Sequence, residues 1–100
     1  PLEVTNLSKM IYELSEKNFC GILHLSSDEI FSKFEFATKI SEFFGFDSNL
    51  IRSGSIEELG FDAKRPKNTT LVNNKAKNLL DTKIDKLDTW LHEIQNKKYV

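Results

Sequence analysis

The stretch that most constrains the fold is SKFEFATKISEFFG, residues 32–45, because it carries both a start and a stop signal for a helix. Ser32 and Glu35 form the S-x-x-E pattern, in which each side chain accepts a hydrogen bond from the other residue's backbone amide. Gly45 stands where a left-handed residue would end the helix. The apolar face between these signals consists of Phe36, Ala37, Ile40, Phe43 and Phe44. The aromatic residues at helix-like spacing are expected to be mostly core, packed against a sheet: Phe34, Phe36, Phe43, Phe44 and Phe46.

Helical spacing of apolar residues predicts three other helices. The first begins after Asn6, which we expect to be its N-cap, and ends near Asn18. A short helix runs from Asn73 or Asn74 to Leu80, and a last helix follows it. The positions that indicate the first and the last of these helices are Leu7, Met10, Ile11 and Leu14, and then Leu87, Trp90, Leu91 and Ile94.

Short strands are expected between these helices. Gly21–Leu25, with the sequence GILHL, has the composition of a strand and is followed by a turn-like SSDE. Residues 50–55 are extended or irregular, and residues 56–59 form either a strand or a single turn. The expected fold class is therefore α/β, in the form of an α+β lobe that is mostly helical with a few short strands.

Composition limits the classes of function. A net charge of −1 gives no general reason to expect binding to nucleic acid or to a membrane surface. No apolar run approaches the roughly 20 residues that span a bilayer, and no signal peptide is visible. Cys20 is the only cysteine, so no internal disulfide can form and a cytoplasmic location is expected.

Motifs for chemistry are missing from the sequence. It contains neither GxGxxG nor GxxxxGK[ST], the usual loops that cradle phosphates. His24 and His92 lack the cysteine or histidine neighbours of a zinc site, so no metal is expected. Ser26, His24 and Asp28 lie too close along one predicted strand to converge as a catalytic triad.

The stretch AKRPKNTTL, residues 63–71, gathers three cations around one proline. No Asp or Glu occurs from Ala63 through Leu80, where Lys75 and Lys77 add further positive charge. Two interpretations stand side by side: a solvated loop with a lysine-rich helix after it, or an anion site. Arg65 favours the second, because its planar fork matches a phosphate and Pro66 restricts the loop. Five cations without interleaved aromatics suit a small-molecule diphosphate better than nucleic acid.

Several pieces stand in the same order as in a known family. They are VTNLSKMIYEL (residues 4–14), GILHLS (21–26), SKFEFA (32–37), FGFD (44–47) and AKRPKN (63–68). This set resembles the C-terminal part of dTDP-4-dehydrorhamnose reductases, in the extended short-chain dehydrogenase/reductase superfamily, over essentially all 100 residues. Leu23, Ser27 and Phe34 replace an aromatic residue, a glycine and a tyrosine of the family pattern, and Asn6 replaces an aspartate.

The resemblance implies that residues 1–100 are the substrate-binding lobe of a two-lobed enzyme, here without its Rossmann domain. That missing domain would bind NADPH or NADH and carry a Tyr-x-x-x-Lys pair. The parent enzyme would reduce the 4-keto group of a dTDP-linked 6-deoxysugar in dTDP-rhamnose biosynthesis, and a homodimer is one arrangement open to it. Glu16 stands four residues after Tyr12, and Tyr99 is next to the last residue. No catalytic residue is therefore expected in this chain, which alone would be inactive.

The resemblance also suggests a role for the basic stretch. In related reductases and epimerases an arginine near the C-terminus meets the substrate diphosphate, and Arg65 stands at the matching position. Lys64 and Lys67 would assist it, while His24, Ser32 and Glu35 are interpreted as structural. Alternatives are an NADP-binding regulatory subunit like the methionine adenosyltransferase β subunit, another nucleotide-sugar epimerase or dehydratase, and a free-standing interaction domain.

Overall fold

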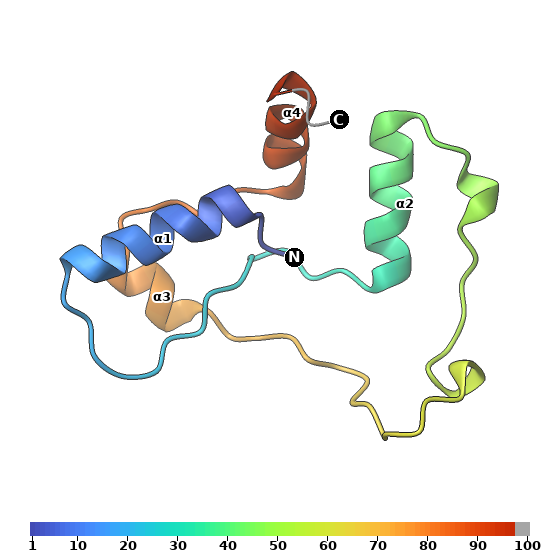
Figure 1. Cartoon of the computed structure of the whole chain (residues 1–100), viewed down its shortest axis with the longest axis horizontal. Helices are drawn as coiled ribbons and strands as arrows, with labels where there is room; N and C mark the ends of the chain where they lie inside the picture. Colours follow the sequence, from blue (N-terminus) through green and yellow to red (C-terminus); the bar gives the residue numbers. More distant parts are fainter. Residues whose placement is uncertain (98–100) are drawn as a thin grey trace. The chain divides into compact units, whose positions relative to one another are not determined.

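The computed structural model describes residues 1–97, and within this range the chain forms helices joined by irregular segments, without any strand (Figure 1). The helices are α1 (Val4–Glu16), α2 (Lys33–Phe44), α3 (Asn74–Leu79) and α4 (Leu87–Lys97), with two short 3-10 turns, η1 (Ser48–Leu50) and η2 (Glu57–Leu59). The chain divides into two compact units. The first unit comprises residues 1–30 and the chain from Leu71 onward, and the second comprises Phe31–Thr70.

The predicted α/β class is wrong for the part of the chain that the structure describes, because Gly21–Leu25 has no partner strand there. Burial nevertheless alternates along the segment: Leu23 and Leu25 are half-buried against the core, while Ile22 and His24 are exposed. Side chains replace a neighbouring strand as hydrogen-bond donors. Lys75 Nζ donates to the Ile22 carbonyl (3.2 Å) and Asn73 Nδ2 to the Ser26 carbonyl (3.1 Å). An extended segment therefore forms without a sheet.

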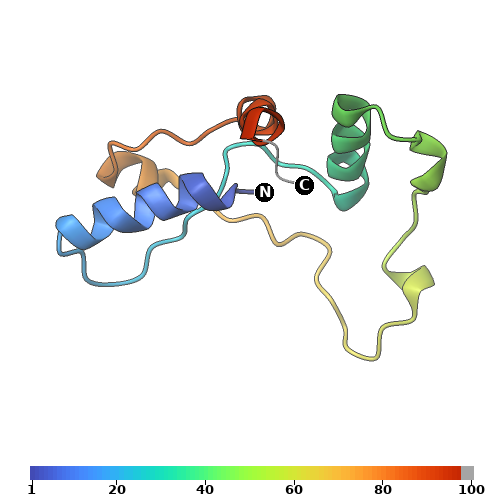
Figure 2. The ribbon, with the colours of Figure 1, turned by 45° about the horizontal axis from the view of Figure 1, so that its top comes forward.

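The core of the first unit lies where α1 and α3 run side by side (Figures 1 and 2). Met10 of α1, Ala76 of α3 and Leu80 are buried there. Partly buried apolar side chains pack against them, Leu14 from α1 and the others from the irregular segments: Leu2, Leu14, Leu23, Leu25 and Ile84. In α4 the predicted apolar face is confirmed, since Leu87, Trp90 and Leu91 are all buried.

The start of α1 differs from the prediction. Glu3, not Asn6, is the N-cap, and its carboxylate accepts from the backbone amides of Thr5 (2.8 Å) and Asn6 (3.0 Å). Asn6 lies inside the helix with only 2% of its surface exposed. After α1 ends at Glu16, Asn18 has a φ of 51°, a left-handed conformation that asparagine tolerates better than most residues.

The connection between α3 and α4 is held by side chains from the other end of the chain. Glu13 accepts from the amides of Asp81 and Thr82 (both 2.7 Å) and from the Thr82 hydroxyl (2.6 Å). Asn6 donates to the Lys83 carbonyl (2.9 Å) and accepts from the Asp85 amide (3.0 Å). Glu29 then accepts from the Leu87 amide (2.7 Å) at the start of α4. These bonds satisfy backbone groups that no helix or sheet satisfies.

In the second unit, α2 begins and ends as predicted. The Glu35 amide donates to Ser32 Oγ (3.1 Å) and the Ser32 amide donates to Glu35 Oε2 (2.8 Å), which completes the capping box. Gly45 ends the helix with a φ of 71°, in the left-handed region where a side chain would be strained.

The aromatic residues around α2 are less buried than predicted. Phe43 packs edge-on against Phe44 (5.0 Å between ring centroids), and Phe44 stacks on Phe46 (5.6 Å). Phe34 and Phe46 are nevertheless 43% and 62% exposed, and no sheet covers them within residues 1–97. The expectation that these aromatic residues are mostly core, packed against a sheet, is therefore wrong for the described residues, although the rings do gather.

Candidate anion-binding site

The three predicted site residues, Lys64, Arg65 and Lys67, all lie on one exposed loop of the second unit. The loop follows η2, which ends at Gly60 in a left-handed conformation with a φ of 62°. Pro66 fixes its own φ and restricts the residue before it to extended geometry, so Arg65 is not free to continue a helix. The local sequence thus presents three cations on irregular backbone.

Arg65 lies over an aromatic ring. Its Cζ is 4.1 Å from the centroid of Phe61, well within the roughly 6 Å at which a guanidinium is attracted to a ring face. Phe61 is itself 46% exposed. Sequence reasoning did not identify this partner, although an aromatic residue four positions before the arginine is a signal that could have been used.

Lys67 is paired within the same unit. Its Nζ lies 3.1 Å from Glu57 Oε1, and both side chains are largely exposed, at 82% and 62%. The backbone amide of Glu57 itself and then the Lys67 ammonium hold the pKa of the Glu57 carboxyl below its usual range. Lys64 is also exposed, and the structure shows no ion pair for it among residues 1–97.

The other two lysines of the basic stretch belong to the first unit and have structural roles there. Lys75 donates to the Ile22 carbonyl, and its Nζ lies 5.5 Å from the Phe19 ring centroid. Lys77 forms an ion pair with Asp28 at 3.1 Å. Lys75 and Lys77 thus have partners within the first unit, and Lys64, Arg65 and Lys67 are the candidate cations of the second unit.

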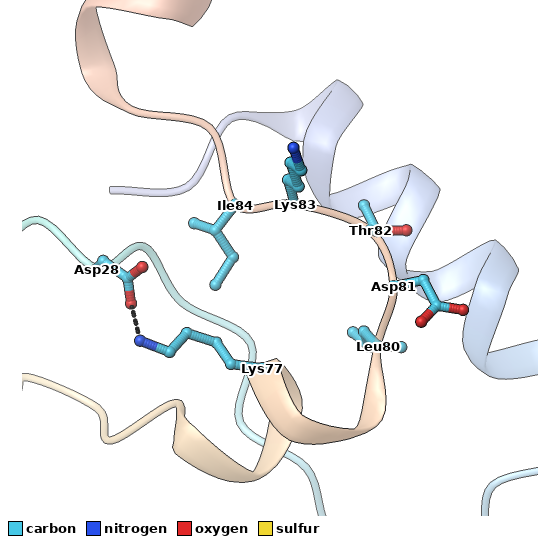
Figure 3. Close-up of a pocket in the computed structure, with 7 residues that line it drawn as sticks. All are labelled: Asp28, Lys77, Leu80, Asp81, Thr82, Lys83 and Ile84. Carbon is cyan, nitrogen blue, oxygen red and sulfur yellow. Dashed lines mark hydrogen bonds and ion pairs between the residues drawn. The ribbon is translucent and has the colours of Figure 1, made fainter.

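The first unit has a shallow hollow of about 340 Å³ beside the Asp28–Lys77 pair (Figure 3). The pair lines it together with the turn after α3: Leu80, Asp81, Thr82, Lys83 and Ile84. Asn73 donates to Asp28 Oδ1 (2.9 Å); this bond and then Lys77 hold the pKa of Asp28 below its usual range. The two charged groups at this edge of the hollow, Asp28 and Lys77, are thus paired with each other.

The described residues offer little other chemistry. None of the helices within residues 1–97 combines the length and the apolar content needed to cross a bilayer. In the same range no three of the histidine, cysteine, aspartate and glutamate side chains gather as metal ligands. Cys20 is exposed.

These features define a class: a small helical lobe whose candidate ligand groups are cations on an exposed loop. The comparison with known families is more specific, since the sequence model described as the RmlD substrate binding domain matches residues 1–99. The chain therefore belongs to the RmlD substrate binding domain family. Searches of curated proteins and of solved structures returned no significant match.

Proposed function

We propose that this chain is the sugar-nucleotide-binding part of a dTDP-4-dehydrorhamnose reductase-like enzyme. The observation that carries the proposal is the family match over residues 1–99. The reaction would be reduction of the 4-keto group of a dTDP-linked 6-deoxysugar. NADPH or NADH would supply the hydride from a dinucleotide-binding domain outside these residues, and a Tyr-x-x-x-Lys pair would stand there as well.

The role of this chain's own residues would be to bind and orient the substrate. Arg65 is exposed, and within residues 1–97 the structure shows no hydrogen bond or ion pair that uses its five N–H donors. A free guanidinium can hold two oxygens of a diphosphate at once. Lys64 and Lys67 would add positive charge beside it. Holding the diphosphate fixes one end of the substrate and so helps to place its sugar for reaction.

The test is substitution of Arg65 by alanine in the full-length protein, assayed by NAD(P)H oxidation with a dTDP-4-keto-6-deoxyhexose. A hydrogen bond to a charged group contributes about 1.5–3 kcal/mol, so KM should rise about 10- to 150-fold. Arg52→Ala is the matched control, because Arg52 is exposed in the same unit. An unchanged KM in R65A would remove Arg65 from the site. Binding of the nucleotide sugar without turnover by the wild-type protein would favour the regulatory-subunit alternative instead.

A further inference from the structure

Two side chains contact the cations of the loop that carries Arg65: Phe61 from the loop itself and Glu57 from the preceding η2. Phe61 lies under the Arg65 guanidinium at 4.1 Å, and Glu57 holds Lys67 at 3.1 Å. Building on the proposed function, we propose that Phe61 is a positioning residue that presents Arg65 to the diphosphate, and that Glu57 occupies Lys67 until a diphosphate displaces it. Together the two would set the affinity of the loop and its preference among anions.

The contact with Phe61 restrains Arg65 without using its donors. An aromatic face attracts the cation through its quadrupole but takes none of the strong in-plane N–H···O bonds that a carboxylate would take. A free arginine loses much rotamer freedom when it is immobilised on a ligand. An arginine already held over a ring loses less of that freedom, so the same hydrogen bonds yield tighter binding.

The contact between Lys67 and Glu57, in contrast, lowers the affinity of the loop for an anion. The Lys67–Glu57 pair is mostly exposed, and exposed ion pairs are weak, so a ligand of higher charge can replace the carboxylate. A diphosphate carries more negative charge than the single carboxylate of Glu57 or than a monophosphate. Glu57 would therefore lower affinity for anions that use Lys67, and by the largest factor for the anion that gains most from that ammonium.

The experiment measures the dissociation constants of dTDP, dTMP and thymidine by calorimetry, on the full-length protein and its variants. Phe61→Leu removes the ring but keeps apolar bulk, and it should weaken dTDP binding about 2- to 5-fold, the factor expected from an exposed cation–π contact. Phe61→Tyr keeps the ring and should restore binding to near the wild-type value. Thymidine lacks phosphate, so its binding should not respond to either change.

Glu57→Gln should tighten binding of dTDP by a larger factor than binding of dTMP, because the more highly charged ligand gains more from a free Lys67 ammonium; the preference for the diphosphate should therefore widen. Glu58→Gln is the matched control, because it changes the net charge equally and Glu58 is an exposed neighbour. If Glu57→Gln and Glu58→Gln bind both nucleotides alike, the role assigned to Glu57 is wrong.

The outcomes separate this inference from the function on which it rests. If Arg65→Ala loses dTDP binding while Phe61→Leu binds like wild type, the positioning role is refuted and the proposed function stands. If Arg65→Ala also binds dTDP normally, the proposed site itself fails, and the inference with it. A second readout does not depend on how the variants fold: in the wild-type protein the ring current of Phe61 should shift the Arg65 side-chain proton resonances upfield. Unshifted resonances would refute the stacking.

Discussion

Asn6 offers the sharpest test of how the first unit is held together. Its side chain is 2% exposed and bridges two residues of the segment between α3 and α4. It donates to the Lys83 carbonyl at 2.9 Å and accepts from the Asp85 amide at 3.0 Å. Asn6→Ala removes both bonds while keeping a residue that favours the helix. The variant should therefore be less stable because two tertiary hydrogen bonds are lost, and not because the helix propensity of α1 falls.

The magnitude follows from the two bonds. Each contributes about 1 kcal/mol net, so the free energy of unfolding should fall by about 2 kcal/mol. Both bonds are only partly buried, so the larger penalty for a fully sealed unsatisfied group is not added. For a domain of this size 1 kcal/mol corresponds to roughly 4–8 °C, so the melting temperature should drop by roughly 8–16 °C.

The assay combines thermal unfolding with amide hydrogen exchange, because the second method reports on Asp85 itself. Asn78→Ala is the matched control, since Asn78 is exposed on α3 and the same substitution there removes no tertiary bond that the structure shows. The reasoning is refuted if N6A has the same melting temperature as N78A and the Asp85 amide keeps its wild-type protection from exchange. Retained protection with a lowered melting temperature would also contradict it, because the loss would then come from elsewhere.

Two further substitutions test local features of the structure. The Thr82 hydroxyl, and then the Asp81 amide, lower the pKa of Glu13 from 4.5 to about 2. Because the folded pKa lies below the unfolded one, this stabilisation is complete above about pH 4.5 and is lost as the pH falls towards 2. Melting temperatures measured between pH 4.5 and pH 2 test this. Glu13→Gln should remove the pH dependence, and the control Glu16→Gln should keep it. Ser32→Ala should lower stability by about 1 kcal/mol through loss of the capping box, with an unchanged KM; a change in KM without a change in melting would show that Ser32 contacts the substrate.

The features of the fold that were predicted correctly are those that depend only on residues close to one another in the sequence. The ends of α2 follow from Ser32, Glu35 and Gly45, which are all confirmed in their expected roles. The predicted short helix is confirmed as α3, and the apolar spacing that indicated the last helix gives the buried face of α4. Capping and helical periodicity act over one to three turns, so a single sequence contains all the information they need.

The parts that failed depend on partners far away in the chain. The composition of residues 21–25 indicated a strand, but it could not show that no strand pairs with the segment within residues 1–97. Asn6 fits a cap by type, yet Glu3 takes that place and Asn6 reaches residues almost 80 positions later. Polar side chains that can cap a helix can equally satisfy distant backbone, and only the tertiary structure decides between these uses.

For the candidate site, too, local features were predictable from the sequence and contacts that depend on the folded backbone were not. The clustering of Lys64, Arg65 and Lys67 was visible in the sequence, because they lie within four consecutive positions. Their partners were not, since contacts with Phe61 and Glu57 depend on how the backbone turns after η2. The sequence also grouped Lys75 and Lys77 with the site, whereas the chain places them in the other unit with partners of their own.

Asn73 provides a direct test of the claim that side chains take the place of a neighbouring strand. It precedes α3 without capping it, so Asn73→Ala removes no helix cap. The variant loses the bond to the Ser26 carbonyl and the bond to Asp28. Because Asp28 is about half exposed, the second bond should count for less, and the expected loss is about 1–2 kcal/mol.

A specific readout accompanies that loss of stability. Asn73 is the main cause of the lowered Asp28 pKa, with Lys77 second, so N73A should raise the Asp28 pKa towards its usual value without fully restoring it. Carboxyl titration by NMR measures this directly. Asn74→Ala is the control, being the adjacent exposed asparagine. If N73A leaves both the Asp28 titration and the melting temperature at the N74A values, Asn73 does not hold the extended segment. The extended conformation of residues 21–25 would then rest on the packing of Leu23 and Leu25 and on the bond from Lys75 to the Ile22 carbonyl.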